Sequence, residues 1–286
     1  MWDGHFWEVA QMTETLLEML SYPFMVRAFV VGILVALCSA LLGVSLVLKR
    51  YSMIGDGLSH VGFGAMAVAA AANAAPLAVA IPVVIVAAVL LLRISGSSRI
   101  KGDAAIALIS TSSLAIGVMV ISMTTGMNTD VYNYMFGSIL AMSQEDVALS
   151  VTLAVVVLAL YIFFYQKIFA ITFDETFARA TGVKAGLYNT LIAVLTAVTI
   201  VLGMRMMGAL LISSLIIFPA LTAMRACRTF RSVTIHAAVI SVVCLAAGLL
   251  MSYLGGTPAG ASVVMANIAA LILYSLAGLI RGRMNR

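Results

Sequence analysis

The feature that most constrains this chain is a series of long apolar segments separated by short breaks. A helix needs roughly 20 apolar residues to cross a membrane. Of all residues, 63% are hydrophobic and 9% are charged, whereas soluble domains carry roughly 25% charged residues. The sequence therefore predicts an all-α, polytopic integral membrane protein with about nine transmembrane helices, or eight. The predicted spans are residues 25–48, 54–72, 77–93, 104–123, 147–165, 187–204, 206–224, 233–253 and 262–280.

No polar stretch between the spans is long enough to fold as a separate domain. Residues 23–286 are therefore predicted to form a single transmembrane domain. Residues 1–22 mix Trp2 and Trp7 with acidic positions, which predicts an amphipathic helix lying at the membrane interface. The alternative count of eight spans arises over 187–224, where the predicted outer turn is very short and contains Arg205. Arg205 is expected either to cap a helix, to pair or to face solvent.

The basic residues predict the orientation of the spans. Placing the odd-numbered loops and the carboxyl terminus in the cytoplasm leaves only Arg27 and Arg205 outside, out of 16 Lys and Arg residues. Cytoplasmic loops carry an excess of Lys and Arg, so we expect an external amino terminus and a cytoplasmic carboxyl terminus. Because these residues lie in short loops between apolar spans, the net charge of +5 does not indicate nucleic-acid binding.

The second predicted span opens with a carboxylate and an imidazole four residues apart. On a helix, Asp56 and His60 share one face, and an ionisable residue within a span is a functional-site hypothesis by default. A carboxylate and a neutral imidazole are suitable ligands for a divalent transition metal. Two ligands do not complete a site, so two simpler roles stay open. Asp56 can cap the helix, and His60 can form a hydrogen bond within the bundle.

Other polar residues near the spans have weaker signals. Asp103 opens the fourth span, where helix capping or an ion pair competes with a role in lining a pore. Ser213 and Ser214 lie inside the seventh span and either line the pore or bond to backbone carbonyls. Asp146 is expected to be a solvated loop acid. The three cysteines, Cys38, Cys227 and Cys244, have no paired spacing that indicates disulfides or a zinc cluster.

Residues 172–182 form a charged and apolar segment on the predicted cytoplasmic side. Its spacing predicts a short amphipathic helix with Gly182 as the C-cap. This helix either lies flat on the membrane or forms a docking surface for a cytosolic partner. Nothing in the chain matches the nucleotide-binding pattern G-x-x-x-x-G-K-[ST], so we expect a transport subunit without its own nucleotide site and not an enzyme.

Several motifs together resemble the membrane permeases of bacterial ABC importers for zinc or manganese. They cover about residues 24 to 280 in the family's order. One departure is the absence of a proline soon after His60. The residue after Pro219 is Ala220, as in the zinc-type permeases, where manganese-type members tend to have Gly. The matching stretches are KRYSMIGDGLSHVGFG, SRIKGDAAIAL, YNYMFGSILAMSQEDV, ITFDETFARATGV, MGALLISSLIIFPALTA and TPAGASVV.

The resemblance implies a homodimeric permease in the bacterial plasma (inner) membrane. Two ATP-binding subunits would sit on its cytoplasmic face, and an external solute-binding protein would deliver the metal. No cofactor is expected to be bound permanently, and the cargo would be a divalent metal, most plausibly zinc. Asp56 and His60 match the acid and histidine of the family's translocation path. The segment that would contact the ATPase consists of Phe173, Asp174, Glu175, Phe177, Ala178, Arg179 and Gly182.

Four alternatives remain open on the sequence. The first two are uptake of manganese or iron(II) by the same mechanism, and an ABC permease for a siderophore or corrinoid, which the charged Asp56 and His60 pair disfavours. A proton-coupled secondary metal carrier would usually need more buried acids than Asp56 and Asp103. An intramembrane enzyme would need a nucleophile and base, and no such arrangement is visible.

Overall fold

The computed structural model describes residues 21–95, 102–124 and 143–284, and within these ranges every regular element is a helix. The predicted amphipathic helix falls on residues 1–20, outside the described residues. In chain order the helices are α2 (Pro23–Leu48), α3 (Ile54–Ala71), α4 (Pro76–Ser95), α5 (Gly102–Met123), α7 (Gln144–Phe163), α8 (Tyr165–Phe173), α9 (Glu175–Ala180), α10 (Ala185–Met207), α11 (Ala209–Ala226), α12 (Phe230–Gly255) and α13 (Ala259–Met284).

Each of the nine predicted ranges contains a helix, but only seven of these helices are both long enough and apolar enough to cross a membrane. The two outside this set are α3 and α11. Helix α3 has 18 residues and is about 27 Å long at 1.5 Å per residue, with Asp56 and His60 lowering its hydropathy. The apolar part of α11 is the shorter stretch Leu211–Ala226. The structure thus supports the polytopic class, while the count of nine crossings stays a prediction.

Several helix ends follow from local sequence chemistry. Pro23 opens α2 at the first helical turn, where its missing amide hydrogen costs nothing. Ser143 and Asp146 form a reciprocal capping box at the start of α7. Thr229 accepts a hydrogen bond from the Ser232 amide at the start of α12. Gly256 ends α12 in the left-handed conformation, with φ of 60°.

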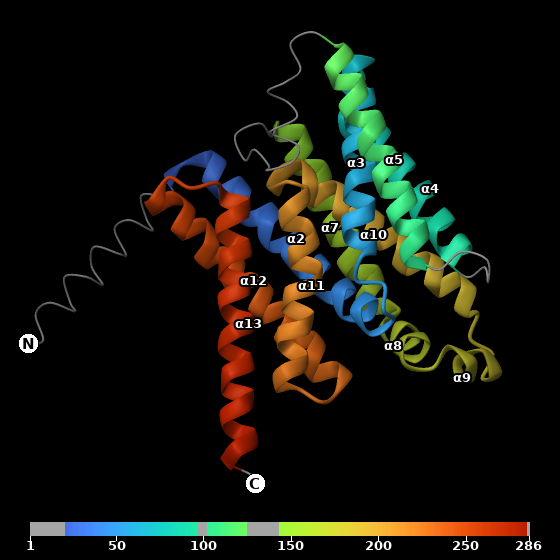
Figure 1. Ribbon diagram of the computed structural model, residues 1–286, viewed down its shortest axis with the longest axis vertical. Coiled ribbons are helices and arrows are strands. Elements are labelled where there is room, and N and C mark those ends of the chain that lie inside the picture. Colours follow the sequence, from blue (N-terminus) through green and yellow to red (C-terminus); the bar gives the residue numbers. More distant parts are fainter. Residues whose placement is uncertain (1–20, 96–101, 125–142, 285–286) are drawn as a thin grey trace, which may run out of the picture.

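Helices α2 and α10 form the interior of the bundle. In each of them, 67% of the membrane-length stretch is buried, compared with 22% in α5, α7 and α13. Figure 1 shows α3, α4 and α5 gathered on one side and α12 and α13 on the other, with α2, α10 and α11 between them. Helices α8 and α9 lie together at one end of the bundle (Figure 1). The outer helices expose large apolar side chains, which suits a surface that faces lipid.

Helices α3 and α5 pack in parallel through two glycines of α3. A Cβ atom on Gly57 would lie 2.6 Å from Cγ2 of Ile106, and one on Gly64 would lie 2.6 Å from the Ser113 carbonyl oxygen. Only glycine permits so close an approach, as in other membrane bundles with small residues at helix contacts. This contact fixes which face of α3 is turned away from α5.

The boundary between the sixth and seventh predicted spans differs from the prediction. Helix α10 continues through the predicted outer turn to Met207, and Gly208 alone, with φ of 86°, separates it from α11. Only a glycine adopts this backbone conformation without strain, so the corner falls there. Arg205 lies inside the last turn of α10 and pairs with Asp146 at 3.6 Å. Pairing was one of the roles left open for Arg205. The prediction of a solvated loop position for Asp146 was wrong, because it caps α7 and holds α10.

Candidate metal centre and coupling segment

The first two turns of α3 bring Asp56 and His60 together. Oδ2 of Asp56 lies 3.7 Å from Nε2 of His60, one helical turn away. The side chain of Asp56 is 48% exposed and that of His60 is 25% exposed. Both are therefore accessible, yet close enough to act on one ion.

Glycines on either side define the face that carries this pair. Gly55 and Gly62 contact Ile216 of α11 and Met204 of α10, whereas Gly57 contacts α5. At 100° per residue, Asp56 and His60 fall between these two rows. The pair therefore occupies the face of α3 that its neighbours within this chain leave partly open.

The simple capping role proposed for Asp56 is wrong. Met53 is the N-cap residue of α3 and makes no side-chain capping bond, and Asp56 is the third residue of the helix. A carboxylate in the first turn still interacts favourably with the helix dipole, by typically 0.3–1 kcal/mol. Capping therefore does not account for an acid at this position.

The pair does not form a complete metal centre within one copy of the chain. Among the described residues, no group of three or more His, Cys, Asp or Glu side chains is placed to hold a metal ion. Zinc usually takes three or four protein ligands, with water filling an open position. Any further ligand must come from water, from outside the described residues or from another molecule.

The other candidate pore residues lie on α5 and α11. Asp103 is exposed in the first turn of α5. Ser213 donates a hydrogen bond to the Ala209 carbonyl at 3.1 Å, and the buried Ser214 donates one to the Leu211 carbonyl at 2.8 Å. Both hydroxyls thus bond to the backbone of their own helix, which was the alternative to a pore role. A pore function for these three residues stays a prediction.

The segment expected to contact a cytosolic partner contains a separate short helix. Asp174 is the N-cap of α9, and its carboxylate accepts a hydrogen bond from the Phe177 amide at 2.9 Å. Gly182, with φ of 86°, follows the C-cap Thr181, so it lies one residue beyond its predicted position. Phe177 is 66% exposed. The helix thus presents an aromatic side chain outward from a well-capped turn.

The inward side of α9 is anchored to the bundle by Ala178 and by the polar contacts of Glu175, which are called the anchor below. Ala178 is buried, and Glu175 reaches two other helices. Its Oε2 atom lies 3.4 Å from Nζ of Lys49, the C-cap of α2, and accepts a hydrogen bond from Asn189 of α10 at 3.0 Å. Its other oxygen pairs with Arg179 within α9. Helix α9 is therefore tied to the ends of α2 and α10.

Electrostatics favour the ionised form of this anchor. Burial raises the pKa of Glu175, but the hydrogen bonds from Asn189 and Arg179 and the charge of Lys49 outweigh it and hold the pKa below its ordinary value. Burial lowers the pKa of Lys49, and the charge of Glu175 offsets part of that decrease. Glu175 is therefore an anion at neutral pH.

Sequence reasoning missed two features of this region. Helix α8 was not predicted, because its nine residues continue the apolar stretch of the preceding span without a glycine or proline between them. The role of Lys49 was missed because its partner Glu175 is 126 residues away in the chain. The sequence did contain a signal for α8. Ile168, Ile171 and Thr172 are spaced by three and four residues, so they share one face of a helix, and all three are buried in the structure.

The described residues include seven helices of membrane length, which define a polytopic α-helical membrane protein. The partly exposed Asp56 and His60 on α3 form a polar site at the surface of its helix bundle. The family model described as "ABC 3 transport family" matches residues 21–278. The chain therefore belongs to the ABC 3 transport family, and the resemblance carried by its motifs is confirmed.

Three relatives share most of their length with this chain. It is 29% identical over 252 residues to the high-affinity zinc uptake system membrane protein ZnuB of Haemophilus influenzae, covering 88% of this chain and 97% of that one. It is 32% identical over 266 residues to a probable iron transport system membrane protein of the same species, covering 92% and 93%. It is 27% identical over 260 residues to the manganese transport system membrane protein MntC of Halalkalibacterium halodurans, covering 91% and 88%.

Solved structures also share the architecture. The PsaBC structure from Streptococcus pneumoniae in complex with Fab contains a chain with a TM-score of 0.82 and 27% identity. The match covers 92% of this chain and 95% of that one. A second structure, an inward-facing putative metal-chelate type ABC transporter, gives a TM-score of 0.64 at 15% identity over 89% and 83% of the two chains. This second likeness supports the fold alone.

Proposed function

We propose that this protein is the permease subunit of an ATP-binding-cassette importer that takes up a divalent transition metal, with zinc as the preferred cargo. The observation that carries the proposal is the Asp56 and His60 pair, 3.7 Å apart and partly exposed on α3. A carboxylate offsets part of the cost of removing a cation from water, and an imidazole favours a transition metal over Ca²⁺ or Mg²⁺. The names of the zinc, manganese and iron relatives agree with such a cargo.

The metal is the substrate of this transporter, so its site must release as well as bind it. Transport requires affinity high enough to admit the ion and low enough to let it leave. Two side chains from one copy, completed by a second copy of the permease or by water, suit this requirement better than a closed four-ligand cage. The exposed Asp56 supports a homodimer in which the two α3 helices approach each other.

The preference for zinc over manganese and iron(II) rests on two features. Imidazole is a ligand that suits zinc, and Ala220 after Pro219 matches the zinc-type pattern. Sequence identities of 29%, 27% and 32% to the zinc, manganese and iron relatives do not separate the three metals. The metal must therefore be tested directly.

In this proposal, residues 23–286 form one permease domain in the bacterial plasma (inner) membrane. Its amino terminus is external, and its carboxyl terminus is cytoplasmic. A separate pair of subunits hydrolyses ATP, and an external solute-binding protein delivers the metal. The positive-inside distribution of Lys and Arg supports the orientation.

The contact with the ATP-binding subunits is assigned to α9. Phe177 is 66% exposed on a short helix whose opposite side is anchored to the bundle. We expect Phe177→Asp to abolish co-purification of the ATP-binding subunits or to uncouple ATP hydrolysis from transport, while the permease stays folded. Phe177→Leu, which keeps an apolar side chain, is the matched control and should assemble normally. Wild-type transport by Phe177→Asp would remove this assignment.

The function is tested by uptake of radiolabelled zinc, manganese and iron(II) into proteoliposomes that contain the full complex. Asp56→Asn retains the size of the side chain but loses its charge, and His60→Ala removes the imidazole. Both should reduce zinc uptake at least tenfold without preventing assembly. Glu145→Gln, which neutralises an exposed acid in the first turn of α7, serves as the control. Uptake at the wild-type rate by both variants would show that the pair is structural, and faster uptake of manganese or iron(II) would reassign the cargo.

A further inference from the structure

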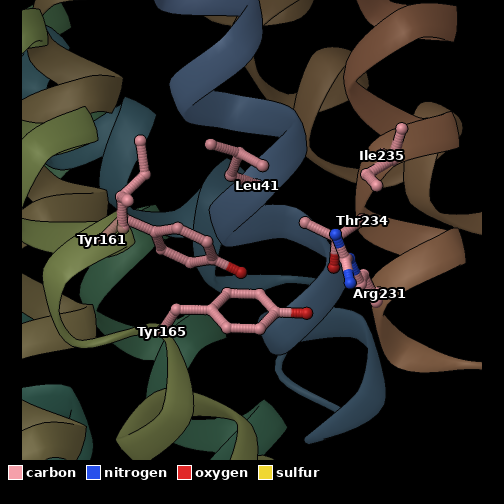
Figure 2. A pocket seen from close by; sticks show the side chains of 7 residues that line it. Leu41, Tyr161, Tyr165, Arg231, Thr234 and Ile235 are labelled. Atoms are coloured by element: carbon pink, nitrogen blue, oxygen red, sulfur yellow. The ribbon is translucent and has the colours of Figure 1, made fainter.

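A cavity of about 300 Å³ lies between α2, the α7–α8 junction and α12, and the transport pathway proposed above does not use it. Figure 2 shows its labelled lining residues, which come from these three parts of the chain. Its lining consists of Leu41, Tyr161, Ile162, Tyr165, Arg231, Thr234 and Ile235. None of its lining residues lies on α3 or on the helices that pack against α3, which are α4, α5, α10 and α11. The cavity is therefore distinct from the Asp56 and His60 pair.

The walls and the mouth of this cavity differ in chemistry. Leu41, Ile162 and Ile235 supply apolar walls. At the other end, the hydroxyl groups of Tyr161 and Tyr165 both point toward α12, where Arg231 and Thr234 lie (Figure 2). An apolar space with a cation and hydroxyl groups on one side matches an amphiphile with an anionic head.

One of these hydroxyl groups lacks a hydrogen bond of normal geometry. Tyr161 is only 2% exposed, and its hydroxyl has no hydrogen-bond partner of normal geometry. The hydroxyl groups near it are those of Thr234 and of Ser45, which also lacks such a partner. The Thr234 hydroxyl instead donates to the Phe230 carbonyl at 2.8 Å. A buried hydroxyl without a partner is costly, so a polar group entering the cavity would relieve this cost. That group must accept a hydrogen bond, as a phosphate or ester oxygen does.

The charged side chains near the mouth of the cavity favour an anionic ligand over a neutral or cationic one. Helix α8 contributes the exposed Lys167, and the start of α12 and the turn before it contribute the exposed Arg228 and Arg231. Residues 147–173 and 225–254 contain no Asp or Glu. The nearest acid along the chain after α8 that points inward is Glu175, and it is already paired with Lys49 and Arg179. Anionic head groups are bound by such basic clusters at the cytoplasmic edge of membrane helices.

The position of the cavity near the ends of two helices is suited to a lipid, and so are the exposed apolar side chains beside it. It lies where α7 ends and α12 begins, which is close to the predicted membrane boundary of both helices. Beside it, Ile162 is 68% exposed, Phe163 is 79% exposed and Ile235 is 52% exposed. In a membrane these side chains face acyl chains rather than water. A lipid can therefore enter from the side without crossing a polar barrier.

We infer that this cavity binds an anionic phospholipid, with an acyl chain between Leu41 and Ile235 and its phosphate at Arg231 and the two tyrosine hydroxyls. The site tethers α12 to the α7–α8 junction, the element that leads directly into α9. Binding of the lipid should therefore stabilise the assembled permease. This inference does not depend on which metal is transported or on the proposed role of Asp56 and His60.

The test compares the thermal unfolding midpoint of the protein in nanodiscs of phosphatidylglycerol and of phosphatidylcholine, together with native mass spectrometry of lipid retained after detergent extraction. We expect phosphatidylglycerol to raise the midpoint and to be retained preferentially. Arg231→Gln should abolish the difference between the two lipids, whereas Arg231→Lys should keep most of it. Arg93→Gln, which changes an exposed arginine near the end of α4 that neither lines the cavity nor belongs to the basic cluster at its mouth, is the matched control and should behave like the wild type.

Three outcomes would overturn the inference. Equal stability and retention in the two lipids would show that no anionic head group is selected. A rise in the midpoint on adding soluble glycerol phosphate in phosphatidylcholine nanodiscs, equal to that in phosphatidylglycerol, would identify a phosphate site rather than a lipid site. Loss of the ATP-binding subunits from Arg231→Gln with unchanged lipid retention would make the mouth of the cavity a protein contact.

Discussion

Lys49 and Glu175 are 126 residues apart in the chain, yet Nζ of Lys49 lies 3.4 Å from Oε2 of Glu175. Lys49 ends α2 and immediately precedes the turn that leads into α3, which carries Asp56. Glu175 opens α9, the helix proposed to contact the ATP-binding subunits. The ion pair is therefore a short physical connection between the coupling helix and the helix that carries the candidate metal ligands.

This connection predicts that Lys49→Met uncouples ATP hydrolysis from transport. Helix α9 would lose a partly buried charge pair, and displacement of α9 would no longer move the end of α2. We expect the number of metal ions transported per ATP hydrolysed to fall severalfold in proteoliposomes, with zinc binding retained. Lys184→Met, which removes an exposed lysine close to α9, is the control. The double variant Lys49→Glu with Glu175→Lys should recover part of the lost coupling, and no recovery would argue against a direct pair.

The pKa of Glu175 predicts a pH dependence of the same contact. A carboxyl group whose pKa is lower in the folded than in the unfolded protein stabilises the fold above its unfolded pKa, and this stabilisation is lost as the pH falls through its folded pKa. Lys49 stays protonated throughout that acidic range. The difference in unfolding midpoint between the wild type and Glu175→Gln should therefore be constant near neutral pH and shrink below about pH 4.3, the ordinary carboxyl value for Glu.

The measurement is thermal unfolding in detergent from pH 7 to pH 3.5 at constant ionic strength. Glu145→Gln, which neutralises an exposed acid in the first turn of α7, corrects for general effects of acid on the protein. A difference for Glu175→Gln that grows on acidification would contradict the anchor role.

Contacts within one helix could be predicted from the sequence, whereas contacts between helices that are distant in the chain could not. The proximity of Asp56 and His60 was predictable, because a spacing of four residues on a helix fixes it without reference to the rest of the fold. The Schellman-like end of α9 at Gly182 was nearly predictable for the same reason, since the signal is a single residue. The pairs Lys49–Glu175 and Arg205–Asp146 were not, because their formation depends on how distant helices pack.

Helix boundaries were predicted well where a strong break occurs and poorly where it does not. Asn73 to Pro76 separates α3 from α4 as expected, because proline begins the new helix. Between α7 and α8 only Phe164 intervenes, with no glycine or proline to mark a break. Between α10 and α11 a short turn over 203–208 was predicted, whereas α10 continues to Met207 and Gly208 alone forms the corner.

The contact between α3 and α5 predicts a large stability effect from a single carbon atom. A Cβ atom on Gly64 would meet the Ser113 carbonyl oxygen at 2.6 Å, and a backbone carbonyl inside a helix cannot move aside easily. We expect Gly64→Ala to destabilise the protein by about 1–3 kcal/mol, the usual cost of overpacking. Gly278→Ala, with open space around its Cβ position, should be neutral or slightly stabilising, because alanine favours helix. Equal unfolding midpoints for the two variants would contradict the close packing of α3 on α5.

The number of metal ions bound per permease tests how the candidate centre is completed. Each copy offers one carboxylate and one imidazole from α3, and no third His, Cys, Asp or Glu side chain joins them among the described residues. Two copies facing each other would bring two such pairs together, so both chains can contribute ligands to one zinc ion while water keeps part of its coordination shell. We expect inductively coupled plasma mass spectrometry of the zinc-loaded complex to give one ion per two permease chains, with loss of the ion in both Asp56→Asn and His60→Ala. One ion per chain would mean that each copy completes its own site, and a dimeric centre at α3 would then be excluded.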